Sequence, residues 1–277
     1  MKKIIVPIDF SKHSEYALKY AANFATKFNA EILALHMLEL SNAVISRTDS
    51  AMHQEAIFFI KLAENKFETF LDKEYLSGLK VTPIVKHFKV FSEVNDVAIA
   101  HNADLVIMGS HGASGVKELF IGSNTEKVVR HSDIPVLVVK QESSKLDFNN
   151  VVFASDFSAK AVRPYLNACN LFKQLDLNMH MVYVNLPDDS FKSTPEIEKS
   201  LEDFFIKAEG HSDKMNSVKC VNDYTIENGI LNFANVVGAD LIAVATHGRK
   251  GIAHFFEGSI SEDIANHSTL PVLTFKI

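Results

Sequence analysis

The sequence is poor in cysteine, glycine and proline, and it has no excess of positive charge. Its 277 residues include two cysteines, 11 glycines and seven prolines, and no tryptophan. Two cysteines cannot build a disulfide framework, and so little glycine and proline excludes a collagen-like or low-complexity chain. The formal net charge of -6 provides no electrostatic attraction to nucleic acid. We therefore expect a globular protein that does not bind nucleic acid.

Long apolar runs are also missing. The runs Leu105–Met108 and Ile134–Val139 are far shorter than the roughly 20 residues that cross a bilayer, so we expect no membrane insertion. The first residues, MKKIIVPIDF, lack the apolar core and the small-residue cleavage site of a signal peptide. These absences predict a cytoplasmic protein. The length of 277 residues predicts one large domain or two small ones.

An internal repeat decides between one domain and two. The segment IIVPIDFS at Ile4–Ser11 returns as VVFASDFS at Val151–Ser158, at an offset of 147. Residues Ala103–Lys140 align without gaps with Ala239–Lys276, at an offset of 136, with 16 identities in 38 positions, where average composition gives about two. The chain is therefore a duplication. The offsets differ by 147 − 136 = 11, which predicts a second copy shortened around Ser41–Gln54.

The two copies predict two domains of the same architecture. Apolar runs of strand length alternate with helical patterns, and runs that are apolar on both faces are typical of a parallel sheet covered by helices. We expect α/β domains with five parallel strands and four helices each, at residues 1–140 and 150–277, joined by a polar linker at 141–149. The strands expected in the first copy are Ile4–Ile8, Glu31–Met37, Val81–His87, Leu105–Met108 and Val136–Val139, and the helices include Gln54–Tyr75, Glu93–Ala100 and Ser123–Arg130.

Candidate binding residues follow two of these strands. Asp9 comes after the first strand, and the loop after the fourth strand contains Gly109 and Gly112 and leads to Gly122-Ser123. Ligands of such sheets bind at the carboxyl ends of the strands. Glycines let backbone amides approach an anion, and the start of a helix adds further amides. The alternative is that the glycines only form turns and that Ser123 only caps a helix.

The spacing of these residues resembles the universal stress protein family, whose ATP-binding members carry G-x2-G-x9-G-[ST] after the fourth strand. Gly109, Gly112, Gly122 and Ser123 match this pattern. The resemblance also includes the VPIDFS segment, Leu35–Met37 and the ending HSDIPVLVV. It covers the first copy and, through the repeat, the second. It implies a tandem universal stress protein with two doubly wound, Rossmann-like domains related to adenine nucleotide α hydrolases.

The resemblance implies ATP, or another adenine nucleotide, as the ligand of the first copy. Because no Walker lysine is present, neutralising the phosphate charge would need Mg²⁺ or Lys117. The residues implied in binding are Pro7, Asp9, Met37, Met108, Gly109, Gly112, Gly122, Ser123, Asn124 and Thr125. No Walker lysine follows the glycines, and the sequence shows no nucleophile, no positioned base and no metal cluster. We therefore predict no catalytic residue and at most slow ATP hydrolysis.

The second copy departs from the pattern at its first glycine. Ala245 replaces Gly109, and Glu257 precedes Gly258, where a carboxylate would repel phosphate. We expect an impaired or altered second nucleotide site, for which the corresponding residues are Asp156, Val184, Val244, Gly248, Gly258, Ser259 and Ser261.

Other conspicuous residues have ordinary interpretations. His36 corresponds to Tyr183 in the second copy, so we predict that it packs rather than reacts. Cys169 and Cys220 are predicted to be structural, the first one buried. The adjacent pairs Phe58-Phe59, Phe204-Phe205 and Phe255-Phe256 cannot all face inward on a helix, so we expect some of these rings to form an interface.

Three functions remain open, of which the third is an enzyme that transfers adenylyl groups or hydrolyses ATP, for which the sequence shows no nucleophile, metal ligands or positioned base. The first is a nucleotide-dependent regulatory or sensor protein of the stress response, controlled by ATP. The second is an interaction module that works without nucleotide and recruits an unknown protein partner through an internal pseudo-dimer. The resemblance implies that the two domains meet through their last strands, Val136–Val139 and Val272–Phe275. A further homodimer stays open.

Overall fold

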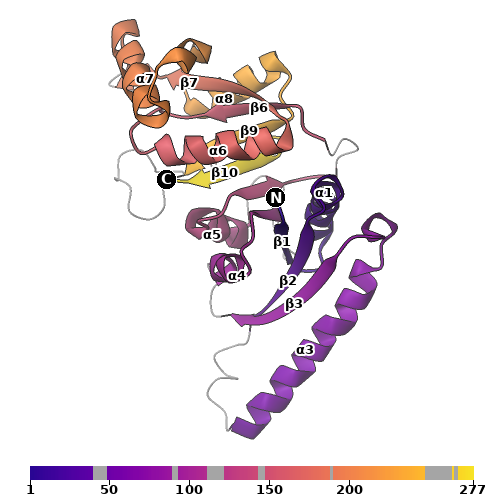
Figure 1. Cartoon of the computed structure of the whole chain (residues 1–277). Helices are drawn as coiled ribbons and strands as arrows, with labels where there is room; N and C mark the ends of the chain where they lie inside the picture. Colours follow the sequence, from indigo (N-terminus) through magenta and orange to yellow (C-terminus); the bar gives the residue numbers. More distant parts are fainter. Residues whose placement is uncertain are drawn as a thin grey trace. The chain divides into compact units, whose positions relative to one another are not determined.

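The computed structural model describes residues 1–39, 49–88, 93–110, 122–142, 147–187, 190–246, 264 and 268–277. The chain folds into two compact units that divide between Leu146 and Asp147. Unit 1 contains the strands β1–β5 and unit 2 the strands β6–β10. Both units are shown in Figure 1.

Unit 1 alternates strands and helices along the chain. Its strands are β1 (Lys3–Ile8), β2 (Glu31–Glu39), β3 (Val81–Phe88), β4 (Leu105–Gly109) and β5 (Val136–Val139). Its helices are α1 (Lys12–Phe28), α3 (Asp49–Leu71), the short 3₁₀ helix η1 (Glu74–Leu76), α4 (Val94–Ala100) and α5 (Ser123–His131). The strands are parallel, in the order β3-β2-β1-β4-β5.

Unit 2 repeats this plan. Its strands are β6 (Asn150–Ala154), β7 (Asn178–Asn185), β8 (Val218–Asn222), β9 (Leu241–Thr246) and β10 (Val272–Lys276). Its helices are α6 (Val162–Leu175), α7 (Thr194–Glu209), the 3₁₀ helix η4 (Asp213–Ser217) and α8 (Ile226–Val237). The order β10-β9-β6-β7-β8 is again parallel. The expected tandem of doubly wound α/β domains is confirmed.

In unit 1, helices cover both faces of the sheet. One face carries a buried cluster in which Met37 and Met108 of the strands meet Val94 and Val97 of α4 and Val128 of α5. Helix α1 lies on the other face, and α3 runs along β3 on that same side (Figure 1). Because both faces are covered, the strands read as continuous apolar runs rather than as alternating patterns.

Identical residues of the repeat make identical bonds at the amino ends of the strands. The Asp104 carboxylate accepts hydrogen bonds from the amides of Lys2 and Lys3, and Asp240 does the same for Asn149 and Asn150. The hydroxyl of Ser132 likewise donates to the carbonyl of Ile134, and that of Ser268 to Leu270. These identities are therefore explained by folding alone.

The shortening of the second copy falls at the predicted place, and part of it is helical. Helix α3 has 23 residues and α7 has 16, and their last residues correspond at an offset of 209 − 71 = 138, so the seven additional residues of α3 are its first ones, at 49–55, which overlap Ser41–Gln54. The rings of Phe204 and Phe205 are both buried, at 2% and 0% exposure. Both rings of this pair face inward because they pack against the rings of Phe157 and Tyr165 and against each other, whereas Phe58 is 62% exposed, as expected for some of these rings. Phe255-Phe256 lies outside the described residues.

Candidate functional site

The strand order places the candidate site of unit 1 between β1 and β4. The chain first adds β2 and β3 along one edge of β1. It then crosses over and adds β4 and β5 along the other edge of β1. Such a switch point leaves a crevice at the carboxyl ends of the two neighbouring strands, where ligands of this fold class bind. Asp9 directly follows β1 and Gly109 ends β4, so the two predicted residues lie at this point.

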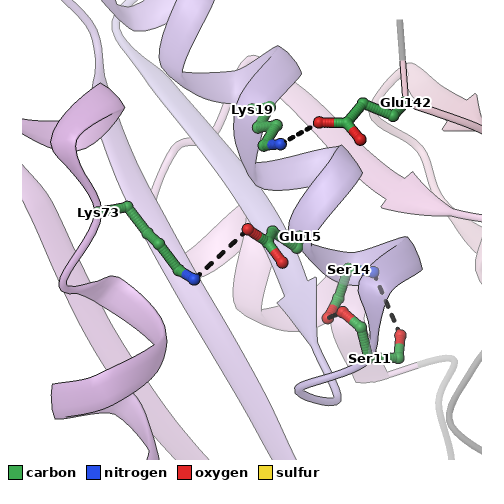
Figure 2. A network of polar contacts seen from close by, with 6 residues as sticks. All are labelled: Ser11, Ser14, Glu15, Lys19, Lys73 and Glu142. Atoms are coloured by element: carbon green, nitrogen blue, oxygen red, sulfur yellow. Dashed lines mark hydrogen bonds and ion pairs between the residues drawn. The ribbon is translucent and has the colours of Figure 1, made fainter.

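Asp9 forms a tight turn that starts α1. Its Oδ1 accepts hydrogen bonds from the amide of Ser11 at 3.0 Å and from the hydroxyl of Ser11 at 2.6 Å. The Ser11 hydroxyl in turn accepts from the amide of Ser14 at 3.3 Å and caps the helix, as Figure 2 shows. Sequence reasoning had missed this capping role of Ser11, although the repeated Asp-Phe-Ser was its signal.

Helix α1 is also held at its exposed side. Glu15 pairs with Lys73, just before η1, at 3.5 Å, and Lys19 pairs with Glu142, which follows β5 (Figure 2). Exposed ion pairs of this kind contribute little, about 0–1 kcal/mol each. They tie α1 to two segments that are distant in sequence, so the position of the Asp9 turn depends on the whole unit.

The residue between Asp9 and Ser11 has an unusual backbone. Phe10 has a φ of 64°, in the left-handed region that non-glycine residues seldom adopt. Its ring packs against His36 at 4.6 Å, Phe67 at 5.2 Å and Phe70 at 5.5 Å between centroids, and the Lys66 ammonium lies 5.4 Å from its centroid. The aromatic packing offsets the backbone strain and fixes the direction of the turn.

His36 belongs to this cluster, and its partly buried position disfavours the charged ring. Its Nδ1 lies 2.7 Å from the carbonyl oxygen of Ile8, which can only accept, so Nδ1 carries the proton. Burial lowers the pKa of His36, and the Lys66 charge lowers it further, whereas the hydrogen bond to Ile8 and the Asp9 charge oppose this. This packed position agrees with the prediction that His36 has a structural role.

The lowered pKa of His36 predicts a pH dependence of stability. In the unfolded chain, the His36 ring gains a proton near pH 6.5. In the folded chain its pKa is lowered, so acid favours the unfolded chain. The free energy of unfolding should therefore fall as the pH drops below about 6.5, and less steeply in His36→Tyr, which introduces the residue of the second copy. Urea unfolding at pH 7.5 and 5.5 measures the two slopes; equal slopes would contradict the prediction.

Gly109 lies against the start of α1. A Cβ added to Gly109 would lie 2.7 Å from the backbone carbon, the carbonyl oxygen and the Cβ of His13, which is closer than real side chains approach. Its carbonyl accepts a hydrogen bond from the buried Thr125 hydroxyl at 2.9 Å. Gly109 is thus required for packing, and Thr125 joins the end of β4 to the first turn of α5.

The same two elements also meet through their backbones. The amide of Gly122 donates to the carbonyl of Ser110 at 2.7 Å, and the amide of Ser110 donates to Val139 of β5 at 2.8 Å. Gly122 caps α5 with extended backbone, and Ser123 is exposed. The two ends of the glycine loop are therefore fixed beside each other at the carboxyl edge of the sheet. Gly112 lies outside the described residues.

The start of α5 has the properties of an anion site. The amides of the first helical residues have no partner within a helix and carry part of its positive dipole charge. In α5 these residues are Ser123, Asn124 and Thr125, and the first bond of the helix itself runs from the amide of Glu126 to Gly122. Because Thr125 is buried and Ser123 exposed, Ser123 and its amide are the more accessible.

Three predicted residues lie beneath this edge rather than on it. Pro7 is a buried residue of β1 rather than a loop residue. The side chains of Met37 and Met108 belong to the apolar cluster under α4 and α5, at 8% and 4% exposure. These three residues are therefore packed beneath the edge of the sheet.

Unit 2 differs at the start of its first helix. Asp156 makes the same turn, accepting from the amide of Ser158 at 3.0 Å, and Phe157 again has a positive φ of 48°. However, α6 begins at Val162 after an uncapped Ala161, three residues later than the repeat of α1 would begin. No partner of the buried Ser158 hydroxyl is found in the part of the chain that the structure describes.

Because α6 starts later, the position that corresponds to His13, Lys160, is not part of a helix. This difference goes together with the replacement of Gly109 by Ala245 in the second copy. Val244 is buried, and Val184 lies under α8, where a Cβ on Gly229 would come within 2.7 Å of it. Gly248, Gly258, Ser259 and Ser261 lie outside the described residues.

The two cysteines have no activating surroundings in the described part of the chain. Cys169 is half-buried rather than buried as predicted, and Cys220 is exposed. Partial burial raises the pKa of both thiols, which opposes thiolate reactivity. Among residues with described positions, no group of three His, Cys, Asp or Glu side chains could ligate a metal ion. No described helix has the length and apolar character to span a membrane.

Comparison with known proteins gives the family. The model of the universal stress protein family matches residues 1–140 and again 147–276. A universal stress protein of Methanocaldococcus jannaschii is 34% identical over 157 residues, which cover 52% of this chain and 97% of that protein. The crystal structure of a universal stress protein from Archaeoglobus fulgidus has a TM-score of 0.65 at 25% identity and covers 99% of this chain and 96% of its own.

The fold is shared more widely. A putative universal stress protein from Pseudomonas aeruginosa has a TM-score of 0.61 at 17% identity, with 100% of this chain and 93% of its own covered. The two family matches correspond to the two copies of the repeat and together include nearly all of the sequence. The chain therefore belongs to the universal stress protein family and carries two domains of that family in tandem.

Proposed function

We propose that unit 1 binds ATP at the switch point between β1 and β4 and that nucleotide occupancy regulates the protein. The observation that carries this proposal is the convergence of three features on one edge: the Asp9 turn, the end of β4 at Gly109, and the first turn of α5. The complete G-x2-G-x9-G-S spacing of this unit and the family membership support it.

In this proposal the residues have different tasks. Asp9, above the floor formed by Pro7, Met37 and Met108, orients the nucleoside. Gly109, Gly112, Gly122, Ser123, Asn124 and Thr125 form the phosphate side, where the amides of α5 favour an anion. Mg²⁺ would be bound together with the phosphates and would neutralise part of their charge. The proposed sensor hydrolyses ATP slowly or not at all.

The first test counts the nucleotides. Native mass spectrometry of the chain with and without Mg-ATP should show one bound nucleotide, in unit 1. Two bound nucleotides would show that the altered second site, with Ala245 and Glu257, also binds. If no ATP binds at concentrations up to the millimolar range, the proposal is wrong.

The sharpest variant pair is at Gly122. Asp and Asn are both favoured helix caps, and Gly122 has the extended backbone of a cap, with φ −60° and ψ 141°. Both substitutions should therefore preserve α5, but only Gly122→Asp places a negative charge beside the phosphates. We expect at least about fivefold weaker ATP binding in Gly122→Asp than in Gly122→Asn, since a repulsion of about 1–4 kcal/mol applies. Isothermal titration calorimetry measures the ratio, and equal affinities would contradict the site.

The alternative function is an interaction module that acts without nucleotide. The observation that favours it is an apolar surface on α3, where Ile57, Phe58 and Leu62 are 51%, 62% and 41% exposed. In this alternative the two domains form an intrachain pair through β5 and β10, each of which is the last strand of its own unit's sheet, and α3 contacts a protein partner. Partner binding that is unchanged in Gly122→Asp would favour the alternative.

A further inference from the structure

The two units differ in how far their first and fourth strands are paired. In unit 1, pairs between β1 and β4 are formed at Ile4 with Leu105 and at Ile5 with Val106, and the described residues show none beyond. In unit 2 the same register continues from Val151 to Ala154, which pairs with Val244. Unit 2 thus has two more pairs, at the positions that correspond to Val6 and Pro7.

Pro7 explains why the pairing of unit 1 stops. In a strand, the N–H and C=O groups of one residue point to one neighbouring strand, and those of the next residue point to the other neighbouring strand. The carbonyl of Lys3 accepts from the amide of Asp104 at 2.9 Å, so Lys3 faces β4. Residue 7, four positions later, must face β4 as well, and proline has no N–H to donate.

The second copy provides the comparison. The carbonyl of Asn150 accepts from the amide of Asp240 at 2.9 Å, in the same geometry as Lys3 and Asp104. Ala154 therefore faces β9 as Pro7 faces β4, but it has an N–H. The shorter pairing of β1 with β4, compared with that of β6 with β9, therefore follows from one difference in the repeat, Pro7 in place of Ala154.

The missing bonds lie directly below the candidate site. β1 stays paired with β2 through Ile8 and His36, and β4 stays paired with β5 through Gly109 and Val139. Between these two pairs of strands, the hydrogen bond that an N–H of residue 7 would donate is missing just before Asp9. The described pairing of β1 with β4 therefore ends two residues earlier than that of β6 with β9.

We propose that Pro7 is a positioning residue that leaves the switch point of unit 1 able to open for a nucleotide, whereas Ala154 holds that of unit 2 closed. This inference rests on the proposed function and specifies which of the two units binds. Besides its place in the floor of the proposed site, Pro7 thereby acts through the β1–β4 ladder.

The test restores the missing donor with Pro7→Ala. The new amide of residue 7 should be protected from hydrogen exchange, as should the amides of Ile107–Gly109, and ATP should bind about two- to tenfold more weakly, the factor that one added hydrogen bond gives. Pro83→Ala is the matched control, because Pro83 lies in β3 at the edge of the sheet, and it should keep the wild-type affinity. NMR-detected exchange and calorimetry provide the two readouts.

The outcomes are separable. If residue 7 is protected and the ATP affinity is unchanged, or if residue 7 exchanges freely, Pro7 does not control the site and the inference is overturned. If the wild-type protein itself binds no ATP, the proposed function is wrong. Hydrogen exchange at residue 7 of Pro7→Ala then still shows whether the added N–H extends the pairing of β1 with β4. The reciprocal Ala154→Pro should lower the protection of Ala243–Ala245, and unchanged protection there also contradicts the inference.

Discussion

Replacing Phe157 with alanine should lower the free energy of unfolding of unit 2 by about 3–5 kcal/mol, the range for removing a fully buried aromatic ring. Phe157 is 2% exposed, and its ring lies 5.2 Å from that of Phe204 and 6.1 Å from that of Phe205. The ring connects the Asp156 turn to α7, so the cavity would open beside the first helix of the unit.

A second substitution separates packing from backbone strain. Phe157→Gly removes the same ring but relieves the positive φ of 48°, which costs a non-glycine residue about 1 kcal/mol. Glycine should therefore destabilise unit 2 less than alanine. Phe191→Ala is the control, because Phe191 is 61% exposed and should change stability by at most about 0.5 kcal/mol.

Urea unfolding followed by circular dichroism gives these differences, and hydrogen exchange assigns them to unit 2, since a chain with two units need not unfold in one step. A loss below about 1 kcal/mol in Phe157→Ala would show that α7 closes over the cavity.

Gly109→Ala should cost unit 1 about 1–3 kcal/mol, the usual range for overpacking a buried position. The added methyl group would meet backbone atoms of His13 at 2.7 Å, and backbone cannot rotate away as a side chain does. Either α1 or the end of β4 must shift, and both belong to the proposed ATP site. We therefore expect weaker ATP binding together with the loss of stability.

Ala245→Gly is the matched control in the second unit. Removing this methyl group relieves no clash, because α6 starts later, and the cost should stay at or below about 1 kcal/mol from backbone entropy. Denaturant titration and calorimetry on both variants test the pair. Wild-type stability in Gly109→Ala would mean that α1 adjusts freely, and the packing explanation of this glycine would be abandoned.

Much of the fold was predictable because the repeat fixes the domain number and the strands are buried on both faces. The strand at residues 4–8 and its copy at 151–154 were found within one residue of β1 and β6. Helix α3 was harder: the apolar pattern predicted 54–75, whereas α3 covers 49–71 and η1 follows separately. A periodic pattern shows that a helix exists, and it determines the ends poorly unless a capping residue marks them.

The site was predictable only as a set of positions. The spacing of Gly109 and Gly122 indicated an anion-binding loop, but it could not show that Gly109 makes room for His13 or that the Thr125 hydroxyl is used in holding β4. Such contacts join residues that are distant in sequence and leave no local pattern. The left-handed turn at Phe10 was equally hidden, since phenylalanine gives no sign of a positive φ.

The position of the first strand of each unit in the middle of its sheet has a consequence for synthesis on the ribosome. The hydrogen bond from Lys2 to Asp104 spans 102 residues, and that from Asn150 to Asp240 spans 90. At about 5–20 residues per second, β1 waits roughly 5–20 seconds after its synthesis before β4 exists to pair with it. During that interval, β1 and β2 present an unpaired apolar edge, which makes the nascent first domain a candidate for chaperone binding.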